Sequence, residues 1–405
     1  MVITEFAELH RVVRDVTVTE AALRAHAALP VHDPSIRSSR GLEEGQPLRE
    51  FKLLPGVKYR FDVDGFGQGL HAALKDAVAG YTMRLRHNGK TIYTLEWNWA
   101  LTPTDGNEGW TPDVRMHIAS CSKLVTAIAM TRLLGHNHMA FNTRIINWLP
   151  DYWIKGPGID QITFRDLLTH RSGFNTGGSD SSFAVMKAQV AAGVTTRGQY
   201  HYENMNFGLC RILLSTINGN IAPGTTFNLP PLPNSNDLIW DFVTINGYVN
   251  YVQQHLFQPA AVAGPTLDHP NPDALAYTFP VSGSGWNSGN LAYMTGGAGW
   301  HMSVDDLLNV MGTARRKGSI IRPERARKML VNGFGVDLIQ NTPLGTLYNK
   351  NGFWMDGAGH VEQSLAYFLP RRMEMVVLAN SPIGSPPQFF RDLVTNLYMA
   401  NIKPA

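Results

Sequence analysis

A near-continuous apolar run from Leu124 to Leu134 constrains the fold most. A helix with this pattern has no polar face and must be covered by other elements on most of its sides. Thr126, Thr131 and Arg132 interrupt the run, which is also too short to cross a bilayer. The chain of 405 residues, 44% hydrophobic and 17% charged, has enough apolar surface to build such a layered core.

Strand patterns occur near both ends of the chain, whereas the middle mixes helix patterns with loops rich in Pro and Gly. The early strands, 81–86 and 91–97, flank Asn88-Gly89, a pair that favours a tight hairpin turn. The late part of the chain predicts three strands and a closing amphipathic helix, at 346–353, 363–369, 374–380 and 387–399.

This order predicts an α+β fold, with one antiparallel sheet assembled from the two ends of the chain and flanked by helices. A mainly helical domain with long loops would be inserted between the two halves of the sheet. We expect a sheet domain from residues 67–140 and 290–405, a helical domain from 141–289, and an N-terminal extension of unknown role at 1–66.

Charge and cysteine content narrow the function class. The net charge is +3, and the densest basic cluster, residues 315–317, fits a solvated helix end better than a nucleic-acid footprint. Cys121 and Cys210 stand among apolar neighbours and are expected to be buried free thiols. Residues 1–6 lack the pattern of a secretory signal. We therefore expect a cytoplasmic protein that binds neither nucleic acid nor membrane and uses no metal or cofactor; the oligomeric state stays open.

Ser120 and Lys123 are the first candidate catalytic pair. Positions three apart on a helix share a face, with Cβ atoms about 5–6 Å apart. A lysine whose pKa is lowered in a cleft can take the proton of a serine hydroxyl and make it a nucleophile. A lysine at the start of so apolar a helix is costly to bury without a purpose.

Tyr202 and Asn204 form a second candidate pair in an irregular stretch. The phenol could relay the serine proton to a leaving group, and the amide could bind a substrate carbonyl or Lys123. A second Tyr-x-Asn, at Tyr248, lies in a helical pattern in which core packing explains it better.

Lys350-Asn351-Gly352 ends a strand pattern and gives a third candidate. The lysine could hold a substrate carboxylate or assist proton transfer, and the glycine would let backbone approach a ligand. Phe353 would add a second N–H to an oxyanion hole beside Ser120. A plain Asn-Gly turn with a solvated lysine explains the residues about as well.

Six segments together resemble the family of class C β-lactamases, family VIII carboxylesterases and D-amino-acid peptidases. Residues 118–123 resemble the family's IASxSK nucleophile helix, and the segment 163–174 resembles its TirdLLtHtSGl motif. The other matches, in the family's order, are 142–150, 202–208, 296–307 and 376–380. The resemblance covers roughly residues 67–400.

The resemblance implies a five-stranded antiparallel sheet, a helical domain and an active site between them. It implies Ser120 as the nucleophile, Lys123 and Tyr202 as the acid/base pair, and Asn204 as a supporting residue. The family's third motif has two candidate positions here, Lys350-Asn351-Gly352 or residues 354–357. We favour Lys350, because Lys-x-Gly occurs nowhere else in the chain.

The expected function is hydrolysis of a small ester or amide through a seryl acyl-enzyme, as in an esterase or a peptidase. An acyltransferase or cyclase of a biosynthetic pathway, or a β-lactamase, is an alternative. A covalent sensor that is acylated without turnover is an alternative of another class. No Gly-x-Ser-x-Gly occurs, which counts against an α/β-hydrolase.

Overall fold

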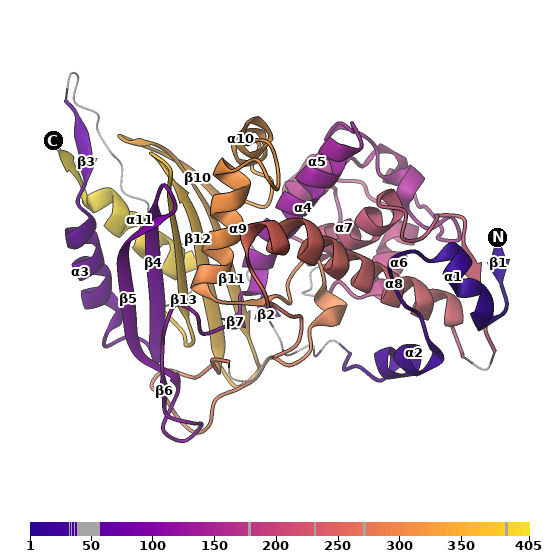
Figure 1. Ribbon diagram of the computed structural model, residues 1–405, viewed down its shortest axis with the longest axis horizontal. Helices are drawn as coiled ribbons and strands as arrows, with labels where there is room; N and C mark the ends of the chain where they lie inside the picture. Colours follow the sequence, from indigo (N-terminus) through magenta and orange to yellow (C-terminus); the bar gives the residue numbers. More distant parts are fainter. Residues whose placement is uncertain are drawn as a thin grey trace.

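The computed structural model describes residues 1–31, 33, 35, 37–38, 57–176, 180–230, 232–269, 273–384 and 388–405. Figure 1 shows a twisted sheet with helices on both faces beside a mainly helical part, with the N-terminus at the helical part and the C-terminus at the sheet. Of the predicted N-terminal extension at 1–66, residues 32, 34, 36 and 39–56 lie outside the described residues.

The main sheet joins the two ends of the chain, as predicted. Its strands run in the order β10, β11, β12, β13, β4, β5 and β6, and β2 pairs with β11. Strand β13 pairs antiparallel with β4, which brings Met375 opposite Leu85. The sheet exceeds the five strands implied by the resemblance, because β10 and the two-residue β2 and β6 add to its edges. The bounds are β2 Arg37–Ser38, β4 Gly80–His87, β5 Lys90–Leu101, β6 Glu108–Gly109, β10 Leu338–Thr342, β11 Gly345–Met355, β12 Val361–Leu369 and β13 Met373–Ala379.

The two faces of the sheet belong to two separate cores. Met375 and Val377 of β13 pack with α3 (Val63–Leu74) and α11 (Gln388–Ala400) on one face. Val376 and Leu378 face the core that contains α9 (Val304–Arg316) and α4 (Ser122–His136). Because successive side chains of a strand point to opposite faces, a strand between two cores is apolar throughout, which explains the pattern at 374–380.

Helix α4 is covered on most of its sides, as its apolar pattern predicted. Its residues from Ser122 to Thr131 are all buried. It contacts α7 (Asn204–Ile217), α8 (Ser235–Val252) and α10 (Pro323–Val331). Thus α4 links the helical part to the sheet and fixes where its own N-terminus meets β11.

Short strands and helices pack the two ends of the chain against the rest of the structure. Strand β1 pairs with β8 and α2 contacts α8 in the helical part, while β3 pairs with β14 beside the sheet. The predicted domain boundaries stay a prediction. The bounds are β1 Val2–Ile3, α1 Leu9–Val12, α2 Glu20–Ala27, β3 Tyr59–Phe61, β7 Met116–His117, α5 Phe164–Leu168, α6 Phe183–Ala192, β8 Thr226–Phe227, β9 His301–Met302 and β14 Ile402–Pro404. Short 3₁₀ or π turns lie at Phe6–Glu8, Ala119–Cys121, Ile146–Trp148, Ile159–Gln161, Gln253–Phe257, Gln258–Ala260 and Ala292–Met294.

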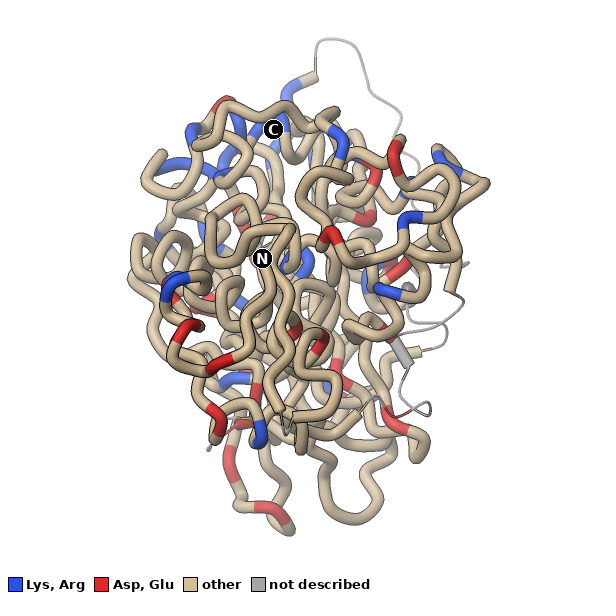
Figure 2. Tube along the Cα trace, turned by 90° about the vertical axis from the view of Figure 1, so that its right-hand side faces the viewer, with Lys and Arg blue, Asp and Glu red and all other residues tan. Residues whose placement is uncertain are grey.

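Several local expectations are confirmed. The hairpin turn lies between β4 and β5, both cysteines are buried and free, and Tyr248 is buried inside α8. Positions of both charge signs are interspersed along the trace in Figure 2. Within the described residues, no helix combines the length and the apolar character needed to cross a membrane.

Glu374 on β13 anchors α9 to the sheet and gives a test of the fold. Its buried carboxylate, 1% exposed, accepts hydrogen bonds from Arg315 and Arg316. Glu374→Ala leaves both guanidinium groups facing β13 without that charge, so we expect the free energy of unfolding to fall by about 3 kcal/mol. Urea denaturation measures the change. Glu324→Ala, on the exposed start of α10, is the control, and a similarly small change in both variants would contradict this role.

Candidate active site

Ser120 lies in a 3₁₀ turn immediately before α4, in a strained backbone. Ala119 has a φ of 46°, a left-handed conformation that L residues rarely adopt. Neighbouring elements fix the turn: the Ile118 carbonyl accepts the Ser364 hydroxyl at 2.6 Å, and the Ile118 N–H donates to Trp300 O at 2.9 Å. Such strain is typical of functional sites, where the surrounding structure holds the side chain in one orientation.

Lys123 is fully buried and has three polar neighbours. Its Nζ lies 3.0 Å from Ser120 Oγ, 2.6 Å from Asn204 Oδ1 and 2.7 Å from the Gly297 carbonyl. The amide and the carbonyl can each accept one N–H. A neutral amine with both hydrogens so placed directs its lone pair at the serine hydroxyl, which is the arrangement required of a base.

The surroundings of Lys123 favour that neutral form. Burial lowers the pKa of Lys123 well below the usual lysine value, and the positive charge of Lys350 lowers the pKa further, while Asp337 opposes this. A charged ammonium loses its hydration in such a place, and among the described residues its hydrogen-bond partners are a hydroxyl, an amide oxygen and a backbone carbonyl rather than a carboxylate.

Tyr202 lies between Ser120 and Lys350. Its hydroxyl donates to Ser120 Oγ at 2.7 Å and lies 3.5 Å from Lys350 Nζ. Burial raises the pKa of Tyr202 above the usual tyrosine value, although the Lys350 cation lowers it. The phenol therefore holds its proton at rest and can lose it next to a positive charge.

His170 positions Tyr202, a role that the sequence alone did not indicate. The two rings stack with centroids 4.3 Å apart. His170 Nδ1 accepts the Glu203 N–H at 3.2 Å, and burial together with the two lysines holds the pKa of His170 well below its usual value. His170 belongs to the segment 163–174, which resembles a family motif. That resemblance indicated the segment but not which of its residues has a role in the site.

Lys350 has a partner that the sequence did not reveal. Its Nζ lies 2.7 Å from Asp337 Oδ1, and both side chains are 1% exposed. Burial lowers the pKa of Lys350, but the carboxylate of Asp337 and the phenol of Tyr202 outweigh burial and raise it above the usual lysine value. Asp337 stands in no recognisable motif, and only the pairing of β10 with β11 brings it here.

The geometry separates the two candidate positions for the third motif. A Cβ atom on Gly352 would lie 3.0 Å from Ser120 N and 2.5 Å from Ile118 O, so β11 approaches the nucleophile closely at Gly352. Trp354 is buried and packs edge-on against His117, with the ring centroids 5.2 Å apart. Asp356 binds His360 in the hairpin beyond. Lys350 and Gly352 thus lie beside Tyr202 and Ser120, and Phe353 follows directly.

A second buried polar pair supports the loop that holds Lys123. His117 Nδ1 lies 2.8 Å from Glu362, and His117 Nε2 accepts the Gly299 N–H at 3.2 Å. Burial lowers the pKa of His117 to about 3 and raises the pKa of Glu362 well above its usual value. This buried pair fixes the chain just after Gly297, whose carbonyl contacts Lys123.

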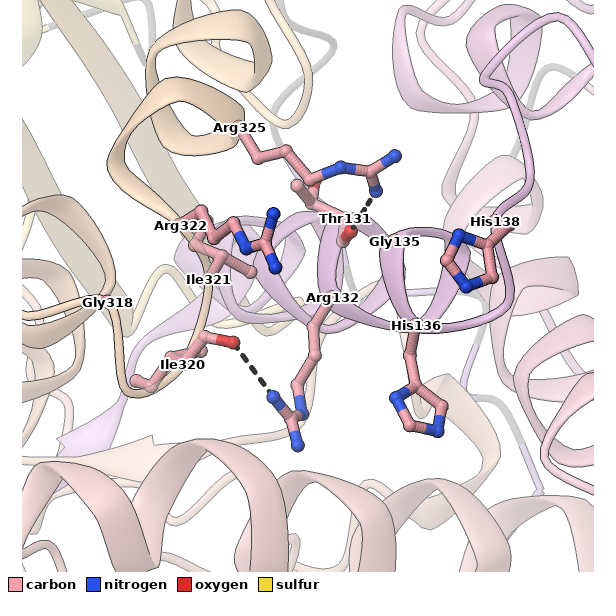
Figure 3. A pocket seen from close by; sticks show the side chains of 10 residues that line it. All are labelled: Thr131, Arg132, Gly135, His136, His138, Gly318, Ile320, Ile321, Arg322 and Arg325. Atoms are coloured by element: carbon pink, nitrogen blue, oxygen red, sulfur yellow. Dashed lines mark hydrogen bonds between the residues drawn. The ribbon is translucent and has the colours of Figure 1, made fainter.

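A surface cavity at the other end of α4 is separate from this site (Figure 3). It has a volume of about 670 Å³ and is lined by Arg132, Arg322 and Arg325 together with His136 and His138. In the described part of the chain, no group of His, Cys, Asp and Glu side chains could hold a metal ion.

Residues 67–225 match the family model described as Beta-lactamase. A search of the curated proteins finds no match to this sequence.

Solved structures share the fold. The octameric penicillin-binding protein homologue from Pyrococcus abyssi is 17% identical with a TM-score of 0.60, over 84% of this chain and 77% of that one. FmtA from Staphylococcus aureus is 15% identical with a TM-score of 0.61, and the match covers 89% of this chain and 95% of FmtA. EstCE1, described as a hydrolase with promiscuous acyltransferase activity, is 14% identical with a TM-score of 0.58, over 83% and 98%. The fold is the β-lactamase/transpeptidase fold.

Gly352→Ala tests the contact between β11 and the nucleophile. The added methyl group needs the space of the Ile118 carbonyl and Ser120 N, so the turn must shift. We expect kcat/KM for an activated ester to fall about 100-fold, as for other displacements of about 1 Å. Gly69→Ala in α3, where the added atom meets only Leu397 at 3.4 Å, is the control. Unchanged kinetics in Gly352→Ala would contradict the contact.

Proposed function

We propose that the chain is a serine hydrolase of the superfamily of β-lactamases and penicillin-binding proteins, and that it cleaves an ester or amide through an acyl-enzyme on Ser120. The arrangement of Lys123 carries this proposal: its nitrogen contacts Ser120 Oγ at 3.0 Å while two carbonyl groups take its hydrogens. A buried neutral amine directed at a serine hydroxyl activates that serine as a nucleophile.

Acylation begins when Lys123 Nζ takes the hydroxyl proton of Ser120. The serine oxygen forms a bond to the substrate carbonyl carbon, and the carbonyl becomes an oxyanion. The N–H groups of Ser120 and Phe353 would bind this oxyanion, since Gly352 lets β11 approach the nucleophile. The bond to the leaving group then breaks, and Tyr202 gives its phenolic proton to the departing oxygen or nitrogen.

After acylation, Lys123 carries the serine proton and Tyr202 is a tyrosinate. The Lys350 cation, 3.5 Å from the phenol oxygen, stabilises this anion. A water molecule loses a proton to Tyr202 and attacks the acyl carbonyl. Ser120 leaves and takes back its proton from Lys123, so both groups return to their starting states.

The remaining predicted site residue, Asn204, serves Lys123 in this scheme. Its amide oxygen lies 2.6 Å from Nζ and is the shortest contact of the lysine. Holding one N–H of the amine keeps the lone pair directed at Ser120. Asn204 is therefore a positioning residue.

Acyl transfer to a second nucleophile is the alternative outcome. It uses the same acylation step, and only the acceptor in the second step differs. The promiscuous acyltransferase activity of the hydrolase EstCE1, which shares the fold, favours keeping this outcome beside hydrolysis. Hydrolysis, as by an esterase or peptidase acting on small substrates, remains the first form of the proposal.

Mass spectrometry and steady-state kinetics with p-nitrophenyl acetate test the proposal. We expect steady release of p-nitrophenol and, after rapid quenching, an acetyl group on Ser120. Ser120→Ala should lose the adduct and at least about 10⁴-fold in kcat. Ser319→Ala, at an exposed position, is the control.

Two outcomes would contradict the proposal. Full turnover by Ser120→Ala would show that Ser120 is not the nucleophile. A stable adduct without turnover would favour a covalent sensor instead.

A further inference from the structure

We infer that Asp337 sets the substrate class of this site: by holding the Lys350 ammonium, it makes the site select acyl substrates that carry no negative charge. This goes one step beyond the proposed function and rests on it. Three features support it: the fixed position of Asp337, the balance of charge around Ser120, and the use of Lys350 by Tyr202.

Asp337 is held in place on both sides of its carboxylate. Oδ1 lies 2.7 Å from Lys350 Nζ, and Oδ2 accepts the Asn351 N–H at 3.1 Å. The Asp337 N–H donates to the Asn349 carbonyl at 2.8 Å, just before the paired part of β10 and β11. Moving the side chain away would leave a buried carboxylate and a buried ammonium apart, which is strongly unfavourable. The pair is therefore a fixed, buried part of the site beside Tyr202.

The charges around the nucleophile cancel. Lys123 and His170 are held toward their neutral forms by burial. The charged groups that act on Tyr202 are Lys350 and Asp337, one of each sign. A substrate carboxylate placed near Lys350 would also face Asp337. The carboxylate would lose its hydration, and no unpaired cation would offset that loss. An uncharged ester or amide meets no such penalty.

Lys350 is directed at the proton relay. Its Nζ lies 3.5 Å from the Tyr202 hydroxyl and 5.0 Å from the centre of the ring. Because Tyr202 serves the leaving group, Lys350 lies on the leaving-group side of the scissile bond. A carboxylate on that side, as in β-lactams and in peptides cut at their C-terminal residue, would compete with Asp337 for the same cation. Substrates with an uncharged leaving group avoid this competition.

Two esters with the same acyl group test the inference: the phenyl ester of an N-acylglycine, and the same ester with a meta-carboxylate on the phenyl ring. Each kcat/KM is divided by the ester's rate of hydrolysis by hydroxide, which removes the difference in intrinsic reactivity. We expect the wild-type enzyme to prefer the uncharged ester by about tenfold or more, the effect of one uncompensated charge in a partly buried site.

Variants assign the preference to the carboxylate of Asp337. Asp337→Asn keeps the size of the side chain and frees the Lys350 cation, so the preference should shrink by about tenfold or invert. Asp337→Glu keeps the charge and should keep the preference. Asp356→Asn changes the net charge equally but lies in the hairpin beyond β11, bound to His360, and should leave the preference unchanged.

Equal use of both esters by the wild-type enzyme, or a preference for the charged one, would overturn the inference even if Asp337→Asn fails to fold. An unchanged preference in a folded Asp337→Asn enzyme would overturn it too. Absence of turnover of both esters, with no adduct on Ser120, would instead overturn the proposed function and this inference with it.

Discussion

The burial of Lys123 is the constraint on which the rest of the site depends. An amine can act as a base near neutral pH only where its charged form is disfavoured, and this requires a place without water. Helix α4 provides that place, because α7, α8 and α10 pack against it and the turn just before it contacts β11 and β12. The apolar run after Lys123 is thus both the reason that the layers assemble and the reason that the lysine loses its proton.

Lys350 is also a buried lysine, but its charged form is stabilised rather than disfavoured. Lys350 is as deeply buried as Lys123, yet its pKa is raised because Asp337 lies 2.7 Å away. One lysine without a carboxylate partner and one with it lie on either side of Tyr202. The phenol can therefore lose and regain its proton beside a fixed positive charge, while the neutral lysine serves Ser120. The position of one aspartate separates the roles of the two lysines.

The sequence predicted the parts of the site that depend on local spacing. Ser120 and Lys123 stand one helical turn apart, and the apolar run placed them at the start of a buried helix. Asp337 could not be found in this way, because its contact with Lys350 arises from the register of two strands. The role of His170 could not be predicted either, because a segment match indicates a motif but not which side chain stacks on Tyr202. The edge strands β2 and β6 were missed because a strand of two residues has no periodicity to read.

Catalysis by this site requires a neutral Lys123 beside a charged Lys350, and NMR titration of the lysine side chains distinguishes these two states. In protein labelled at lysine Nζ and Cε, the Lys123 signal can be assigned by its loss in Lys123→Arg. We predict that this signal titrates well below the ordinary lysine value of 10.5 and that the Lys350 signal titrates above it. A Lys123 signal that titrates at or above 10.5 would contradict the account, because no base would then face Ser120.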